Sequence, residues 1–125
     1  MAMTIADTDV LIDFLKDRGE AARVQSEIEA ARLCTTVITA FELWAGAGTP
    51  HQLGDVDTLL GALIILTLDS AAAQRAGQIQ RDLARKGTPI AMADSLIAGI
   101  CLEYDATLLT RNLKHFQRVP GLQLG

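Results

Sequence analysis

Three carboxylates lie within seven residues of one another near the start of the chain, in the segment MTIADTDVLID that begins at Met3. An ionised carboxylate is costly to bury without a partner, so an apolar strand avoids aspartate unless a cation or a donor lies beside it. We expect Asp7 at the end of a strand, pointing into the crevice above a sheet, with helix capping as the alternative. Asp9 is interpreted as a helix cap and Asp13 as a surface partner of Lys16.

Two more acids stand near the beginnings of predicted helices. Glu42 follows Thr39 at the spacing of a capping box, in which the glutamate folds back onto the cap residue's amide. Its position at the same end of the sheet as Asp7 favours a role in the site instead, and both interpretations stay open. Asp94 heads an apolar stripe formed by Ile97, Ala98 and Cys101 at helical spacing, so we interpret Asp94 as functional rather than as a first-turn acid.

Several acids that converge on one crevice repel one another, and a divalent cation relieves that repulsion. Oxygen ligands select hard ions such as Mg²⁺ or Mn²⁺. His51 and His115 are interpreted as surface residues. The sequence contains no Ser-His-Asp or Cys-His pattern and no G-x-x-x-x-G-K-[ST] phosphate loop. Metal-activated water is therefore the hydrolytic chemistry that these residues favour.

The composition predicts one compact domain over residues 1–125, because half of the residues are hydrophobic and 21% are charged. A net charge of −4 argues against a protein that coats nucleic acid by bulk attraction, so any nucleic-acid chemistry must rely on local cations. The longest apolar run, residues 59–68, is too short for a bilayer, which needs ~20 residues. With no secretory signal visible, we expect a cytoplasmic protein without membrane contact. Cys34 and Cys101 are expected to be reduced and buried.

Short apolar runs alternate with helical patterns along the chain. Strands are predicted over residues 4–7, 33–37, 63–67, 107–110 and, at an edge, 122–124. Helices are predicted over residues 10–16, 20–32, 39–45, 50–62, 70–86 and 91–104, with a helical turn over 113–116. This alternation predicts an α/β fold with a parallel sheet covered on both faces. In such sheets a site forms beyond the carboxyl ends of the strands, where Asp7 stands.

Four segments occur in a characteristic order: DTDVLID from Asp7, TAFEL from Thr39, ADSLIA from Ala93, and LLTRN from Leu108, which runs on into FQRVPGL. Together they closely resemble the PIN domain, specifically the VapC-like ribonuclease toxins of bacterial toxin–antitoxin pairs. The resemblance implies a three-layer α/β/α sandwich with a central, mainly parallel sheet of four or five strands. It also implies a metal-dependent endoribonuclease that cleaves RNA phosphodiester bonds with Mg²⁺, for which Mn²⁺ can substitute.

The resemblance carries over to individual residues. Asp7, Glu42 and Asp94 match the family's first three acidic positions and are the implied metal ligands. Asn112 occupies the fourth catalytic position, which is commonly Asp; its amide offers an oxygen but no charge, so one ion held mainly by Asp7 and Asp94 is expected. Four residues near the crevice are expected to contact the substrate: Thr8, Arg111, Lys114 and Arg118. For the three cations, the alternative is an ordinary solvated basic face.

The same resemblance implies partners. We expect a homodimer that is inhibited by a small VapB-like antitoxin carrying an apolar helix and a basic side chain aimed at the acids. Phe14, Phe41 and Trp44 flank the predicted site and could line a groove for that helix, although core packing is the simpler interpretation of each.

Two alternatives remain for the function. Ile5 and Ala6 followed by D-T-D fit the hydrophobic-D-x-D motif of haloacid-dehalogenase-like phosphatases, in which Asp7 would be a nucleophile and Asp9 a general acid. The other alternative is a PIN-like protein-binding module that has lost activity, which the neutral residue Asn112 suggests.

Overall fold

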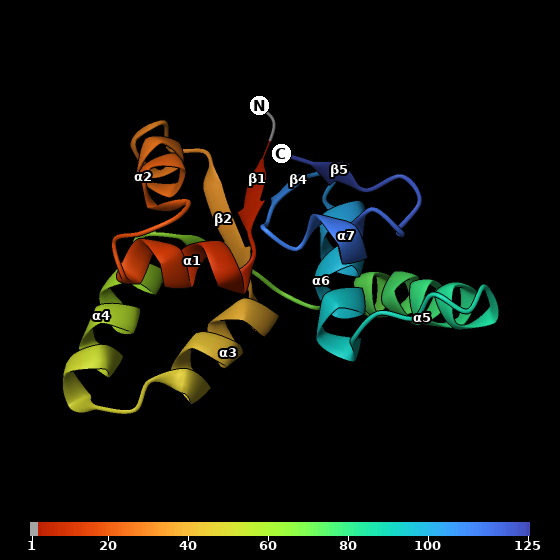
Figure 1. Ribbon diagram of the computed structural model, residues 1–125, viewed down its shortest axis with the longest axis horizontal. Helices are drawn as coiled ribbons and strands as arrows, with labels where there is room; N and C mark the ends of the chain where they lie inside the picture. Colours follow the sequence, from red (N-terminus) through yellow and green to blue (C-terminus); the bar gives the residue numbers. More distant parts are fainter. Residues whose placement is uncertain (1–2) are drawn as a thin grey trace.

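A sheet of five parallel strands forms the centre of the computed structural model, which describes residues 3–125 (Figure 1). The strands are β1 (Thr4–Ala6), β2 (Leu33–Thr36), β3 (Ile64–Leu66), β4 (Thr107–Leu109) and β5 (Gln123–Leu124). Their order is β3-β2-β1-β4-β5, and every neighbouring pair is parallel. The predicted parallel sheet and its edge strand are therefore confirmed, and β1 lies at its centre.

Helices cover both faces of this sheet. They are α1 (Thr8–Leu15), α2 (Ala21–Glu29), α3 (Val37–Gly46), α4 (Pro50–Gly61), α5 (Ser70–Arg85), α6 (Met92–Glu103) and α7 (Leu113–Phe116). Figure 1 shows α1 to α4 on one side of the sheet and α5 to α7 on the other, which confirms the three-layer sandwich. The helix predicted over residues 20–32 ends earlier, at Glu29, because Ala31 adopts a left-handed backbone conformation with φ 56°.

Successive strand residues face opposite layers and so build two cores. In β1, Ile5 packs into the core formed with α5 and α6, whereas Ala6 packs into the core formed with α1 to α4. Leu108 and Leu109 divide in the same way in β4. Because both faces of the central strands are buried, β1 and β4 consist mainly of apolar residues, and their short length places polar residues immediately at the strand ends.

The packing of α5 against α6 fixes the position of Asp94, which lies in the first turn of α6. Gly99 faces α5, and a Cβ at this position would lie 2.7 Å from the carbonyl oxygen of Ala72 and 2.9 Å from the Cβ of Ala76. The two helices therefore approach backbone to backbone at this point, which only glycine permits. Within residues 3–125, no helix is both long and apolar enough to cross a bilayer.

Both cysteines are buried and unpaired, as predicted. Burial raises the pKa of the Cys101 thiol to about 12, and the nearby charge of Asp7 adds to this effect. Burial also raises the pKa of Cys34. Since the thiolate is the reactive form of cysteine, both side chains serve as small apolar groups of the core.

Candidate active site at the carboxyl ends of the strands

Asp7 follows β1 directly and lies where α1 begins. Its Oδ1 accepts a hydrogen bond of 2.8 Å from the backbone N–H of Thr8, and its Oδ2 accepts one of 2.7 Å from Thr110 Oγ1. The side chain is buried, and these two bonds fix both of its oxygens. Asp7 is thus the N-cap of α1 as well as a crevice acid, and the prediction that Asp9 would be the cap is wrong.

Asp9 instead joins the acid cluster. Its Oδ2 accepts a hydrogen bond of 3.1 Å from the backbone N–H of Arg111 and lies 3.4 Å from Thr110 Oγ1. Its Oδ1 is buried and has no hydrogen-bond partner in the described part of the chain. A buried carboxylate oxygen without a donor is costly and marks a place for a cation or an ordered water. The position of Asp9, two residues after Asp7, was the signal for this role.

Glu42 is not part of a capping box, so the capping alternative that its spacing to Thr39 left open is wrong. Thr36 is the N-cap of α3, because its Oγ1 accepts the backbone N–H of Thr39 at 3.1 Å. The carboxylate of Glu42 is therefore free to face α1, where its Oε1 accepts a hydrogen bond of 2.7 Å from Thr8 Oγ1. Thr8 was predicted to contact the substrate; in the structure it holds Glu42 beside the N-terminus of α1, where Asp7 lies.

Asp94, Asn112 and His115 meet on the other side of the crevice. The Nδ1 of His115 lies 3.9 Å from Asp94 Oδ2 and 3.0 Å from the amide nitrogen of Asn112. The surface interpretation holds only in part for His115, whose side chain is 45% exposed while α7 turns its ring toward Asp94. It holds for His51, which is exposed and lies 3.6 Å from Asp55. No sequence pattern links His115 to Asp94.

The acids perturb one another's protonation. Burial raises the pKa of Asp7 to about 6, and the charges of Asp9 and Asp94 add to the increase, while the hydrogen bonds from Thr110 and Thr8 oppose it. Burial also raises the pKa of Asp94; Glu42 and Asp9 add to that rise and His115 opposes it. A crevice whose acids resist ionisation is one that a bound cation stabilises.

The oxygen ligands of the crevice fit a hard divalent cation that keeps part of its water shell, rather than an ion that is coordinated by protein ligands alone. Within residues 3–125, no three His, Cys, Asp or Glu side chains are gathered closely enough to form a complete ligand set. Mg²⁺ is usually held by one or two carboxylates, with water and phosphate oxygens completing its shell. Asp7 and Asp94 could supply those carboxylates, and the unpartnered Oδ1 of Asp9 could accept from an ordered water nearby.

A second cluster, centred on Asp13, stabilises the turn at Arg111, whose backbone N–H donates to Asp9. Asp13 is buried and accepts a hydrogen bond of 3.1 Å from the backbone N–H of Glu20. Its carboxylate also lies 3.0 Å from Arg111 Nε and 3.6 Å from Arg18 Nε. The predicted surface pair with Lys16 is therefore wrong. Arg111 was predicted to contact the substrate. Its guanidinium instead forms an ion pair with Asp13, and only its backbone N–H donates to Asp9.

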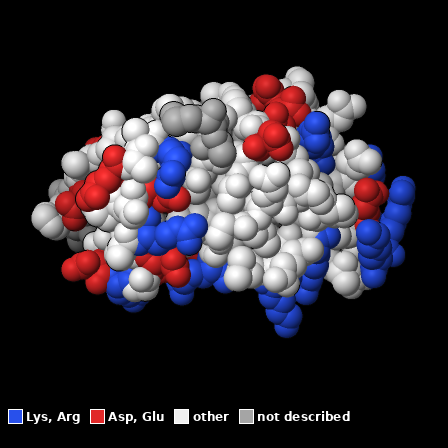
Figure 2. All heavy atoms as spheres, turned by 90° about the horizontal axis from the view of Figure 1, so that it is seen from above, with Lys and Arg blue, Asp and Glu red and all other residues white. Residues whose placement is uncertain are grey.

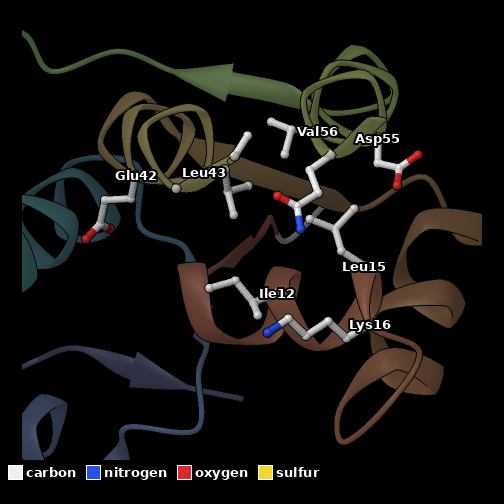
Figure 3. A pocket seen from close by; sticks show the side chains of 10 residues that line it. Ile12, Leu15, Lys16, Glu42, Leu43, Asp55 and Val56 are labelled. Carbon is white, nitrogen blue, oxygen red and sulfur yellow. The ribbon is translucent and has the colours of Figure 1, made fainter. Parts of the chain in front are cut away.

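A groove of about 400 Å³ begins beside the acids and runs between α1, α3 and α4 (Figure 3). Its floor is apolar, with charged rims, and Figure 3 shows Glu42 at one end; the lining includes Ile12, Leu15, Leu43, Val56, Lys16 and Asp55. Phe41 and Trp44 are 67% and 44% exposed, so the core-packing interpretation is wrong for both. Phe14 packs partly against the core of this layer.

The sequence matches the family model of the PIN domain over residues 4–122, nearly the whole chain. This chain belongs to the PIN domain family. The tRNA(fMet)-specific endonuclease VapC of Salmonella typhimurium is 34% identical to it, and the match covers 99% of this chain and 97% of that protein. Ribonuclease VapC1 of Haemophilus influenzae is 30% identical, over 94% of this chain and 92% of the relative.

Solved structures agree with this PIN assignment. DNA-bound VapBC from Salmonella typhimurium has a TM-score of 0.90 and 33% identity, covering 100% of this chain and 98% of that one. VapBC-1 from nontypeable Haemophilus influenzae has a TM-score of 0.82 and 27% identity, covering 98% of this chain and 96% of that one. The resemblance to VapC-like PIN domains is confirmed, and the phosphatase alternative is wrong.

Proposed function

We propose that this PIN domain is an endoribonuclease that depends on Mg²⁺ or Mn²⁺ and is the toxin of a VapBC-like pair. The proposal is supported by the mutual influence of three acids from elements that are distant in sequence: the charge of Asp94 raises the pKa of Asp7, and the charge of Glu42 raises the pKa of Asp94. Relatives that match this chain over nearly its whole length are named ribonucleases, which supports an RNA substrate.

In this proposal Asp7 and Asp94 hold the cation, with Glu42 on the same crevice. The bound ion would lower the pKa of an attacking water and offset the charge of the phosphate. The hydrogen bonds from Thr8 and Thr110 keep the Asp7 carboxylate in a single orientation. Thr8 Oγ1 holds one oxygen of Glu42, which leaves its Oε2 to accept the proton of the water; Asp94 is the alternative acceptor.

We also propose that the groove between α1, α3 and α4 receives an antitoxin helix. Its apolar floor suits the apolar face of a helix, and its end at Glu42 would bring a basic side chain to the acids. VapBC complexes among the structural neighbours support such a partner. Phe41 and Met92 are exposed, precede Glu42 and Asp94 closely in sequence, and support the proposed homodimer. We place this activity in the cytoplasm, where RNA and a co-expressed antitoxin are present.

The test is RNA cleavage by the purified chain, with Mg²⁺ or with a chelator, and with or without the product of the neighbouring gene. We expect internal cleavage that the chelator abolishes and that the neighbour inhibits, together with a dimeric mass in solution. Asp94→Asn is the control, and its activity should fall at least ~100-fold because a metal ligand is lost. Cleavage that persists in the chelator or in this variant would remove the metal site from the mechanism. If the wild type cuts no RNA, the protein-binding module suggested by Asn112 is the better description.

Asn112→Asp should increase the affinity for Mn²⁺ several-fold, because a carboxylate beside His115 adds charge as well as an oxygen at the crevice. In the absence of metal the same variant should melt at a lower temperature, since the new charge repels Asp94. Calorimetric titration with Mn²⁺ measures the first effect. Gln117→Glu is the matched control, because it adds the same charge at an exposed position just beyond α7. Equal affinities for the two variants would place residue 112 outside the influence of the ion.

A further inference from the structure

The cations of this chain divide into two groups according to their partners. Each cation of the first group lies within 4.0 Å of a carboxylate oxygen: Arg18, Arg23, Arg32, Arg75 and Arg111. In the part of the chain that the structure describes, the remaining Lys and Arg side chains have no such partner: Lys16, Arg81, Arg85, Lys86, Lys114 and Arg118. All members of the second group except Lys16 lie at or after the C-terminal half of α5.

These unpaired cations belong to one connected region, which we call the α5–α7 basic surface: Arg81, Arg85, Lys86, Lys114 and Arg118. Arg81 and Arg85 are exposed and stand one turn apart on α5, and Lys86 begins the loop that follows. Arg118 Nη1 donates a hydrogen bond of 3.0 Å to the carbonyl oxygen of Pro89 in that loop, so the segment after α7 is joined to the end of α5. Figure 2 shows Lys and Arg side chains at the right-hand edge of the molecule, the side on which α5 lies in Figure 1, with acidic side chains among them.

The elements that carry the α5–α7 basic surface also contact the residues around Asp94. Lys114 is the neighbour of His115, whose ring lies 3.9 Å from Asp94. On the α5 side, Ser95 donates a hydrogen bond to Gln80, which precedes Arg81 in sequence. Sequence neighbours of two of these cations therefore contact Asp94 or the residue next to it. An RNA strand that leaves the crevice toward α7 or the C-terminal half of α5 would approach unpaired positive charge.

We propose that the α5–α7 basic surface binds the phosphates of the RNA strand on one side of the cleaved bond. The proposal rests on the ribonuclease function proposed above. A crevice lined by acids repels a polyanion, so an RNA strand needs cations nearby that no carboxylate already neutralises. The surface supplies such cations on α5, in the loop that follows it and around α7. Contacts of this kind give affinity without reading sequence, and a single RNA strand is flexible enough to follow them.

The experiment compares a triple variant, Arg81→Gln with Arg85→Gln and Lys86→Gln, with Arg75→Gln. Arg75 lies on the same helix but is paired with Glu103 at 2.7 Å, so the control removes a cation that is already neutralised. Steady-state cleavage is measured on a long single-stranded RNA and on a dinucleotide, over a range of salt concentrations. Binding of the long RNA in chelator is measured separately by fluorescence anisotropy.

Each phosphate contact on a single strand contributes a slope of about −0.7 to log K against log salt. Losing three contacts should therefore weaken binding roughly 100-fold at 0.1 M salt and reduce the slope by about 2. KM for the long RNA should rise by the same factor, while kcat and cleavage of the dinucleotide stay unchanged. Arg75→Gln should behave as the wild type on both substrates.

Two outcomes would overturn the proposal. The first is a triple variant that binds long RNA with wild-type affinity and slope. The second is a lower melting temperature with unchanged RNA binding, which would show that these cations only stabilise the C-terminal end of α5. The anisotropy measurement tests RNA binding separately from the proposed ribonuclease activity. If the wild type cuts no RNA, the ribonuclease proposal fails, yet a selective loss of RNA binding in the triple variant still supports the surface.

Discussion

Replacing Asp7 by asparagine should abolish RNA cleavage and at the same time stabilise the metal-free protein. Loss of an outer-sphere partner of a metal ligand typically costs 10–100-fold, so loss of a ligand itself should cost at least ~100-fold in cleavage rate. The stabilisation arises because Asp7 is buried among other acids, while asparagine keeps the oxygen that accepts the Thr8 N–H. RNA cleavage and thermal melting in chelator measure the two effects. A variant that retains wild-type cleavage would remove Asp7 from the site.

The pH dependence of the same variant gives a signed test. The pKa of Asp7 is raised from 3.8 to about 6 in the folded protein. Its contribution to stability is therefore fully present below about pH 3.8 and is lost as pH rises through about 6. At pH 7.5 this difference amounts to roughly 3 kcal/mol. The gap in melting temperature between Asp7→Asn and the wild type should widen from pH 5 to pH 7.5 without metal, and a gap that stays constant would contradict the assigned burial effect.

The second large effect is expected at Asp13. Removing both of its arginine partners, with Arg18→Gln and Arg111→Gln together, leaves a buried carboxylate with only the N–H of Glu20. Breaking a buried ion pair in this way costs 3–5 kcal/mol, and we expect about 3 kcal/mol because both guanidinium groups are half exposed. Urea unfolding measures this loss.

Adding Asp13→Asn to the double variant should recover most of the stability, because the unpaired charge is then removed. Arg75→Gln is a suitable control, since its partner Glu103 is not buried. Cleavage by the double variant should also fall, because Arg111 donates its N–H to Asp9 from the turn that Asp13 holds. A double variant as stable as the wild type would mean that solvent screens Asp13 despite its burial.

The fold could be predicted because its signals are local. Apolar runs of strand length alternate with helical periodicity, and each element ends at a polar residue, a glycine or a left-handed turn. The acids Asp7, Glu42 and Asp94 could be predicted because each lies next to the carboxyl end of a strand or in the first turns of a helix. For Glu42, however, spacing could not decide between two caps, since both Thr36 and Thr39 stand near the end of β2.

Partners that are distant in sequence could not be predicted. Asp13 receives Arg111, and Asp94 receives His115, only because β4 and α7 return to the N-terminal strand and α6. The pattern around Asp13 is that of an ordinary surface i,i+3 pair, and nothing local shows that the residue is buried. Phe41 and Trp44 were equally ambiguous, because a large aromatic residue on an apolar helix has the same sequence pattern whether it faces a core or a partner.

The central place of β1 has a consequence for the newly made chain. Asp7 obtains its hydrogen bond from Thr110, 103 residues later in the sequence, and β1 cannot pair with β4 until residues 107–109 have been synthesised. At 5–20 residues per second, the segment up to Leu109 takes about 5–22 s to make. A nuclease with this strand order cannot complete its acid crevice before then, and an inhibitor made in parallel has that time to be present.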